Sequence, residues 1–288
     1  MSFISKLIKN IFKFFLPDSI YIRYEYFKLH RRFYSDKKIE TFSDRIFSWK
    51  LDNKLASFST FVDKYKVRDF VSDKVGDNYL PKLIKTISAP EDFELTDMPN
   101  KFVMKLNNGC GYNFVVKDKN ALNTASIRKM IRKWLDSDFY ALSKEKQYKN
   151  VKQLIIIEEF IESSGILKDY KFYCIDGKIE FIQVISERSN GSQRHNYYSK
   201  EWKPLEISRK EYPKGDLEAK PVLLEQAVKV VEVLSSSFSF VRVDLYIQEK
   251  IFFGELTFTP GNGYIKYYPD SFDKLLASKM KLEFKPTK

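Results

Sequence analysis

Residues 240–263 place the strongest constraint on how this chain can fold. They contain two short runs rich in β-branched and aromatic residues, separated by the polar residues 248–250, and this pattern predicts a β-hairpin. Asp244 lies in the first run and Glu255 in the second, so the turn brings the two carboxylates roughly opposite one another. Their side chains share a face only if the register is right, and the sequence does not fix the register.

Two carboxylates in such apolar strands raise the question of how their charges are compensated. Buried carboxylates are costly unless they are paired with cationic groups or bound to a cation. Carboxylate oxygens suit Mg²⁺ that also contacts substrate phosphates, which indicates a metal site. The alternative is an ordinary edge hairpin whose two acids face solvent, and the hairpin alone favours neither interpretation.

Composition narrows the class of protein. The chain has 288 residues, enough for one large domain or two modest ones. Its net charge of +12 favours anionic partners such as nucleotide phosphates, acidic sugars or an anionic membrane surface. Two cysteines without metal or disulfide spacing indicate a reducing compartment, so a cytoplasmic location is expected. No nucleic-acid-binding motif is present, so a nucleic-acid partner is not expected.

The first residues form a basic amphipathic segment. Residues 3–16 place apolar side chains at helical spacing and three lysines on the other face. The segment is too short and too charged to span a bilayer. A helix of this kind can lie at the inner face of the cytoplasmic membrane, drawn by anionic lipid, or can simply pack on the domain surface.

Two further stretches carry candidate phosphate-binding groups. Residues 18–34 and 51–75 are predicted to be helical, and Lys64 and Arg68 then stack at i and i+4, where they could meet a phosphate or pair with neighbouring acids. A predicted strand from residue 101 contains Lys105 and enters a turn with Gly109 and Gly111, which could cradle phosphates or form a plain hairpin. A strand returns at residue 114, and a helix is expected over 121–140.

The second half of the chain adds more charged positions near strand ends. Residues 154–161 are predicted to be an apolar strand with two acids, Glu158 and Glu159, near its end. A strong hairpin follows over 167–184, in which Asp169 and Lys171 alternate in phase and therefore face the same side. Arg188 lies at the end of that hairpin. Residues 190–216 are predicted to be a polar loop with short strands, and residues 219–236 and 270–280 are predicted to be helical.

In this order, these features resemble the ATP-grasp superfamily. Four sequence motifs resemble those of its TupA-like branch, which is linked to teichuronopeptide and bacterial surface-polysaccharide biosynthesis. They are residues 63–71, 168–178, 241–246 and 253–263. The resemblance covers roughly residues 45–280. It implies an α+β fold with two antiparallel-sheet lobes that clamp ATP after a helical extension. The expected divisions are an extension over 1–58, an N-terminal lobe over 59–160 and a C-terminal lobe over 161–288.

The resemblance also implies a role for each candidate residue. The expected nucleotide contacts are two phosphate-binding lysines with a neighbouring arginine, a glycine loop, a hinge that reads adenine and an acid near the ribose: Lys64, Lys105, Arg68, Gly109, Gly111, Glu158, Glu159, Phe160 and Asp169. The expected Mg²⁺ ligands are Asp244, Glu255 and Thr257. The expected catalytic residues are Arg188, Arg242 and Lys171, of which the arginines stabilise the anionic transition state. Many members of the superfamily have Asn where this chain has Thr257. A hydroxyl is a weaker ligand, so the number of bound metal ions, one or two, stays open.

The activity implied is an ATP- and Mg²⁺-dependent carboxylate–amine ligase. The expected carboxylate is a uronic acid of a bacterial surface polysaccharide or its precursor, with a lipid-linked acceptor as one option, and the co-substrate is an amine or amino acid. The aromatic-bearing loop over 190–204 is a candidate for acceptor contact. Two alternatives stay open: a glycosyltransferase-like or kinase-type glycan-modifying enzyme, and a non-catalytic nucleotide-binding scaffold of a polysaccharide assembly complex.

Overall fold

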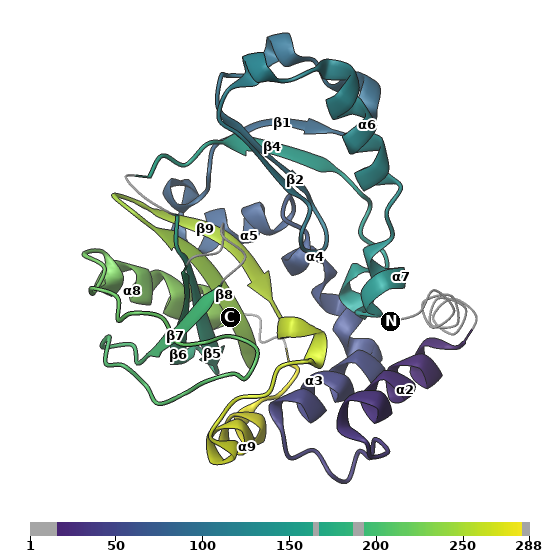
Figure 1. The fold of residues 1–288 in the computed structure, drawn as a ribbon, viewed down its shortest axis with the longest axis vertical. Helices are drawn as coiled ribbons and strands as arrows, with labels where there is room; N and C mark the ends of the chain where they lie inside the picture. The colour runs from purple at the N-terminus through teal and green to yellow at the C-terminus, as the bar shows by residue number, and fades with distance from the viewer. Residues whose placement is uncertain (1–15, 164–166, 187–192, 284–288) are drawn as a thin grey trace.

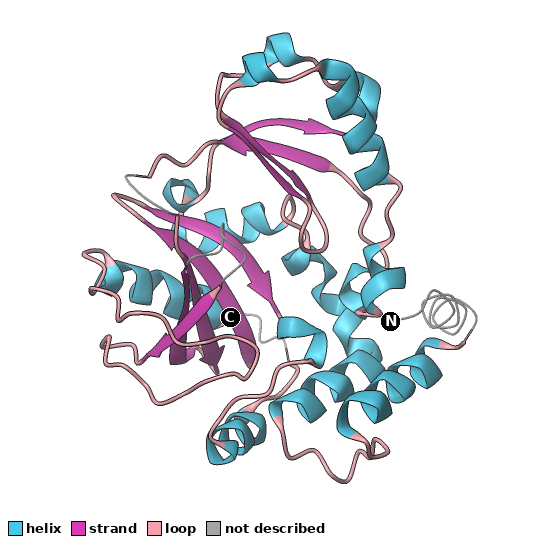
Figure 2. Ribbon diagram, viewed as in Figure 1, coloured by secondary structure: helices cyan, strands magenta, loops and turns pink. Residues whose placement is uncertain are grey.

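The computed structural model describes residues 16–163, 167–186 and 193–283. Within these residues the strands form two separate antiparallel sheets, and helices cover the sheets and fill the space below and between them (Figures 1 and 2). The predicted α+β architecture with two antiparallel sheets is confirmed. The amphipathic segment 3–16 lies outside the described residues apart from Leu16, and none of the described helices is long and apolar enough to cross a membrane.

The first sheet has the strand order β1-β4-β2-β3. Its strands are β1 (Leu83–Ile87), β2 (Phe102–Leu106), β3 (Asn113–Val116) and β4 (Ile155–Glu159). The uninterrupted isoleucine run of β4 is explained by its interior position, because both faces of that part of the strand are buried. Helix α6 (Thr124–Leu135) packs on this sheet through Ile127 and Ile131 (Figure 1).

The second sheet has the strand order β7-β6-β5-β8-β9. Its strands are β5 (Asp169–Ile175), β6 (Lys178–Ser186), β7 (Arg194–Tyr198), β8 (Phe240–Ile247) and β9 (Ile251–Thr257). Both predicted hairpins are present, and the turn of the second occupies residues 248–250. Helix α8 (Leu224–Ser235) places an apolar stripe against this sheet, which contributes to the largest buried cluster of the described chain.

The predicted continuous helix over 51–75 is wrong. The structure has a 3-10 helix η1 (Asn53–Phe58), a short α4 (Ser59–Val62) and α5 (Val67–Val75), with a break between the last two. At the break Asp63 accepts hydrogen bonds from the backbone N–H groups of Tyr65 and Lys66. Aspartate side chains compete with the helical backbone in this way. Lys64 therefore lies outside α5, and Lys64 and Arg68 do not share a continuous helix face.

The other helices agree with the predictions in kind and differ in length. The predicted helix over 121–140 ends at Leu135, and a second helix α7 (Phe139–Ser143) follows after a break. The remaining helices of the N-terminal region are α2 (Asp18–His30) and α3 (Phe42–Leu51), and α9 (Asp270–Lys279) lies beside them (Figure 1). Helices α3 and α9 contact each other.

The segment around α4 and α5 packs with the second sheet. Sequence order assigns residues 59–75 to the N-terminal lobe. Their buried side chains instead belong to the cluster formed around the second sheet, together with neighbours from η1: Leu55, Phe58, Val62, Val67 and Val71. The divisions at residues 58 and 160 stay predictions, and by packing this segment is joined to the later part of the chain.

Candidate functional site

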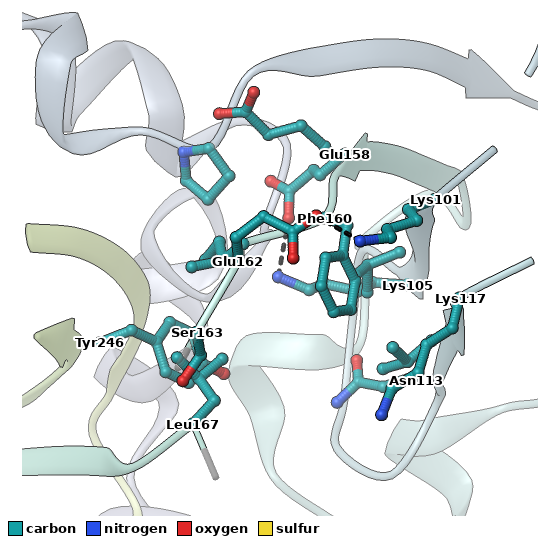
Figure 3. A pocket seen from close by; sticks show the side chains of 15 residues that line it. Lys101, Lys105, Asn113, Lys117, Glu158, Phe160, Glu162, Ser163, Leu167 and Tyr246 are labelled. Atoms are coloured by element: carbon teal, nitrogen blue, oxygen red, sulfur yellow. Dashed lines mark hydrogen bonds and ion pairs between the residues drawn. The ribbon is translucent and has the colours of Figure 1, made fainter. Parts of the chain in front are cut away.

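Two adjoining cavities lie where the two sheets face each other. The larger, of about 660 Å³, is lined by β2, β3, residues 158–163 and Tyr246 (Figure 3). The smaller, of about 70 Å³, is lined by Lys64, residues 109–111 and the charged side chains of the second sheet. Three residues line both cavities, namely Lys105, Asn113 and Tyr246, so the two form one continuous site.

The larger cavity combines apolar walls with a charged end. Val103 of β2, Val115 of β3 and Leu167 are among its apolar lining residues. Glu158 lies at the charged end, where the Lys105 Nζ donates to one carboxylate oxygen at 2.7 Å. The Arg68 guanidinium donates to the other oxygen at 2.9 Å. A flat aromatic ring with polar edges suits such a slot.

The β8–β9 register places Asp244 directly opposite Glu255. A β-bulge follows Asp244, and Gly254 lies at it. A Cβ on Gly254 would approach the Asp244 carbonyl oxygen to 3.0 Å, a tight contact, so the close backbone approach at the bulge favours glycine. Both carboxylates face the same side, because one guanidinium, that of Arg242, contacts both.

Arg242 is the centre of this charged group. Its guanidinium donates to the two Asp244 oxygens at 2.7 and 2.8 Å, to Glu255 at 3.1 Å and to the Thr257 hydroxyl at 3.0 Å. Such a forked arrangement depends on the planar guanidinium and is not available to lysine. The three carboxylates and three cations of the group are Asp169, Asp244, Glu255, Lys64, Lys171 and Arg242.

The two lysines extend the group to neighbouring elements. Lys171 on β5 lies between Asp169, at 2.7 Å, and Asp244. The Lys64 Nζ lies 3.5 Å from Glu255 and donates to the Gly109 carbonyl at 2.7 Å. Lys64 therefore ties the glycine loop of the first sheet to an acid of the second. Gly109 has a φ of +76°, a conformation that glycine adopts without strain.

Burial and the neighbouring charges shift the pKa values of Glu255, Lys171 and Asp244 in this group. Burial alone raises the pKa of Glu255, but Lys64, Arg242 and Lys171 outweigh burial and lower it to about 2. Burial and the neighbouring Arg242 lower the pKa of Lys171, but the surrounding carboxylates, Asp169 first, raise it above its ordinary value. Burial raises the pKa of the Asp244 carboxyl above its ordinary value, although Arg242 and Lys171 oppose this effect.

The oxygens of Asp244, Glu255 and Thr257 fit a hard divalent cation. They come from adjacent strands, face the same guanidinium and are the ligand type that Mg²⁺ prefers. Among the described residues, no group of three or more His, Cys, Asp or Glu side chains could hold a metal ion. A cation at this position therefore needs further oxygens, and the phosphates of a nucleotide would supply them.

The structure brings most of the predicted site residues together. Those that line one or both cavities are Lys64, Lys105, Gly109, Gly111, Glu158, Glu159, Phe160, Asp169, Lys171, Asp244 and Glu255. Arg68, Arg242 and Thr257 contact these residues without lining the cavities. Arg188 lies outside the described residues. The binding and catalytic roles of all these residues stay predictions.

Several lining residues were missed from the sequence. Lys101, directly before β2, and Val103 lie at two-residue intervals from Lys105. Val115 and Lys117, the latter directly after β3, lie at two-residue intervals from Asn113. Strand residues two apart share a face, so the alternation gave a signal for all of them. The same rule places Tyr246 beside Asp244 on β8.

Glu255 makes the stability of the fold depend on pH in the acid range. Because its folded-state pKa of about 2 is below the ordinary 4.5, the ionised carboxylate stabilises the fold above about pH 4.5. This contribution, on the order of 2 kcal/mol, is lost as the pH falls from about 4.5 towards 2. We expect the difference in urea-unfolding free energy between the wild type and Glu255→Gln to shrink over that range. A difference that stays constant with pH would contradict the assignment.

Comparison with known proteins gives one family match. A family model described as TupA-like ATPgrasp matches residues 44–281. None of the curated proteins compared matches this chain. The structural matches include the D-alanine–D-alanine ligase from Bacillus anthracis complexed with ATP, at 14% identity and a TM-score of 0.44, covering 72% of this chain and 56% of that one.

Two further solved structures have similar scores. The D-alanine–D-alanine ligase from Helicobacter pylori has 19% identity and a TM-score of 0.40, covering 78% of this chain and 60% of that one. The ATP-grasp ligase PsnB complexed with a phosphomimetic precursor variant, Mg and ADP has 11% identity and a TM-score of 0.42, covering 83% and 66%. The chain thus spans 56% to 66% of the length of these proteins.

Proposed function

Because this chain belongs to the TupA-like ATP-grasp family, we propose that it is an ATP- and Mg²⁺-dependent ligase that joins a carboxylate to an amine. One observation carries the proposal. A cavity with apolar lining residues lies next to a cluster of lysines and paired carboxylates, and Lys105, Asn113 and Tyr246 line both. Base, phosphates and metal ion of a nucleotide need these environments in this order.

In the proposed complex, the adenine ring lies between Val103, Val115 and Leu167 of the larger cavity. Lys105 turns from Glu158 towards the phosphates, while Arg68 keeps the Glu158 carboxylate paired. Lys64 and the backbone N–H groups of residues 109–111 face the terminal phosphate. Asp169 is placed for the ribose, as the family resemblance implies.

Asp244 and Glu255, with Thr257 as a weaker partner, would hold Mg²⁺ against the phosphates. The ion would neutralise phosphate charge and make the γ-phosphorus more electrophilic. Arg242 fixes both carboxylates through its fork of hydrogen bonds and offers positive charge to the transferring group. Lys171 donates a hydrogen bond to Asp244 and would hold that carboxylate in place.

The proposed reaction has two steps. A substrate carboxylate oxygen attacks the γ-phosphorus, the bond to the oxygen bridging the β- and γ-phosphorus breaks, and ADP leaves. The amine then attacks the acyl carbon of the acyl phosphate, phosphate leaves and the amine nitrogen loses a proton. The protein supplies position and charge and forms no covalent bond, so it needs no Ser–His or Cys–His pair.

The proposal extends to the substrates. We propose a uronic acid of a bacterial surface polysaccharide or its precursor, free or lipid-linked, as the carboxylate. The family resemblance and the net charge of +12 support this choice. A cytoplasmic site of action, with contact at the inner face of the membrane through residues 3–16, is supported by two free cysteines and the basic character of that segment.

Calorimetric titration of the protein with ATP, with and without Mg²⁺, tests the first part of the proposal. We expect binding that is much tighter with Mg²⁺. Acceptor-dependent ADP release and the product mass test the second part, and the expected mass gain corresponds to an amide. ATP binding without acceptor-dependent ADP release would favour the nucleotide-binding scaffold, and a product that gains only a phosphoryl group would favour a kinase. Absence of ATP binding would contradict the proposal.

A further inference from the structure

The helix α2 carries hydrophobic side chains on two sides. Its inner side packs on α3, where Ile22 and Tyr26 belong to a buried cluster. Its outer side is exposed. Five of the thirteen large hydrophobic side chains that are exposed among the described residues lie within residues 20–33, namely Ile20, Tyr24, Phe27, Leu29 and Phe33. A helix that packs on one partner normally has one hydrophobic side, so the outer side of α2 indicates a second contact.

Three of these side chains form a stripe along the outer side of α2. Ile20, Tyr24 and Phe27 are spaced at i, i+4 and i+7, which places them one above another on a helix. Phe33, which is 83% exposed, follows the helix, and its ring stacks on that of Phe27 at a centroid distance of 5.0 Å. The stack extends the stripe beyond the last turn of α2, at the edge of the molecule (Figure 1).

Two arginines accompany the stripe. Arg23 lies on the same side of α2, Arg31 follows its last turn, and both are exposed. Arg32, by contrast, is paired with Asp44 at 2.7 Å. Neither Arg23 nor Arg31 has an ion-pair partner among the residues that the structure describes. Residues 18–38 as a whole contain six Lys or Arg and three Asp or Glu. The outer side of α2 is therefore both hydrophobic and positively charged.

This combination fits the surface of an anionic bilayer better than the other partners. Aromatic and aliphatic side chains enter the headgroup boundary, and each arginine near an anionic surface raises affinity about fivefold. A second copy of this chain would bring the arginines of two such surfaces together, and like charges repel. A nucleic acid would match the arginines but would leave the aliphatic Ile20 in water. The basic segment 3–16 also leads directly into α2.

We propose that the outer surface of α2 binds a bilayer that contains anionic phospholipid. This α2 surface consists of Ile20, Arg23, Tyr24, Phe27, Arg31 and Phe33. It adds a contact on described residues to the one proposed for residues 3–16, and it does not depend on the ligase activity. With 13 residues and an arginine within its stripe, α2 would lie on the bilayer and not cross it.

The contact would also orient the reaction site. Helix α2 packs on α3, and α3 contacts the 3-10 turn η8 (Pro260–Gly263). Only two residues separate η8 from the end of β9, the strand that carries Glu255. The α2 surface is thus joined through packed elements to the second sheet, so a bilayer bound there would lie in a fixed direction from the site.

Co-sedimentation of the full chain with vesicles tests this proposal. We expect the wild type to bind vesicles of phosphatidylcholine with phosphatidylglycerol, more weakly as salt rises, and to bind phosphatidylcholine alone weakly. Replacing both Phe27 and Phe33 with Ser removes the stacked rings, and replacing both Arg23 and Arg31 with Gln removes the charges. Each double variant should bind the anionic vesicles about tenfold or more weakly.

Matched controls make the same chemical changes at exposed positions elsewhere. They are Leu217→Ser with Val222→Ser, and Lys129→Gln with Lys133→Gln on α6. Both should bind the anionic vesicles as the wild type does, and thermal unfolding shows whether each variant is folded. Losses as large in the controls would assign the binding to overall hydrophobicity and charge and would overturn the proposal.

Other outcomes separate this surface from the alternatives. No binding of the wild type to anionic vesicles would overturn the proposal. Unchanged binding in both α2 variants would also overturn it and would leave the contact to residues 3–16. A wild type that dimerises in solution, and becomes monomeric in the Phe27 and Phe33 variant, would assign the α2 surface to a second copy instead. ATP binding, measured separately, decides the proposed function and leaves this result unaffected, because none of the substituted residues lines the two cavities between the sheets.

Discussion

Replacing Glu255 with Gln lowers acceptor-dependent ATP turnover by about 10²- to 10³-fold and removes most of the Mg²⁺ dependence of ATP binding. Gln has nearly the same shape, so the β8–β9 hairpin keeps its register. The variant loses one of two carboxylates that lie opposite each other beside Lys64, a proposed phosphate-binding lysine. ADP release and calorimetric titration with ATP, each with and without Mg²⁺, measure the two effects.

Glu249→Gln is the control for this experiment because it makes the same chemical change in the turn of the same hairpin. Glu249 is exposed and lines neither of the two adjoining cavities between the sheets. Its variant should match the wild type in turnover and in Mg²⁺ dependence. If the Glu255 variant kept Mg²⁺-dependent binding, the metal ion would have to lie away from the β8–β9 hairpin, and the proposed assignment of Asp244 would fail with it.

The hairpin shows how far the sequence could predict the site. Two runs rich in β-branched and aromatic residues and a polar turn predicted both strands and placed an acid in each, because these signals are local. The pairing of Asp244 with Glu255 depends on a one-residue bulge at Gly254, which shifts the register within β9. A bulge is chosen by the fit of the whole strand to its neighbours, so local patterns do not determine it.

The sequence did not predict the break before α5 or the cavity lined by Glu25 and Tyr264, and the two omissions have different physical reasons. Periodicity predicted a helix through residue 63, but the Asp63 carboxylate bonds to the backbone N–H groups of Tyr65 and Lys66 and ends the pattern. The second feature, this cavity, is lined by Glu25 and Tyr264, which are 239 residues apart in the sequence. Only tertiary packing brings such residues together, so no motif could indicate the cavity.

Arg242→Met is expected to lower the free energy of unfolding by about 3 kcal/mol and to abolish turnover. In a chain of this size that corresponds to a melting temperature roughly 5–10 °C lower. The Asp244 side chain is 4% exposed and loses both hydrogen bonds from the guanidinium. Lys171 then remains beside Asp244 and also pairs with Asp169, so less positive charge compensates the two buried carboxylates. Urea and thermal unfolding measure the loss.

A second substitution separates charge compensation from packing. Asp244→Asn in the Arg242→Met background removes the uncompensated charge, so we expect stability to return to within about 1 kcal/mol of the wild type. Turnover should stay lost, because both the metal ligand and the guanidinium are gone. Arg132→Met, which breaks the exposed pair with Glu91, is the control and should cost less than about 1 kcal/mol. A double variant as unstable as the single one would mean that Arg242 stabilises the fold by packing, and its proposed role in fixing the two carboxylates would fail.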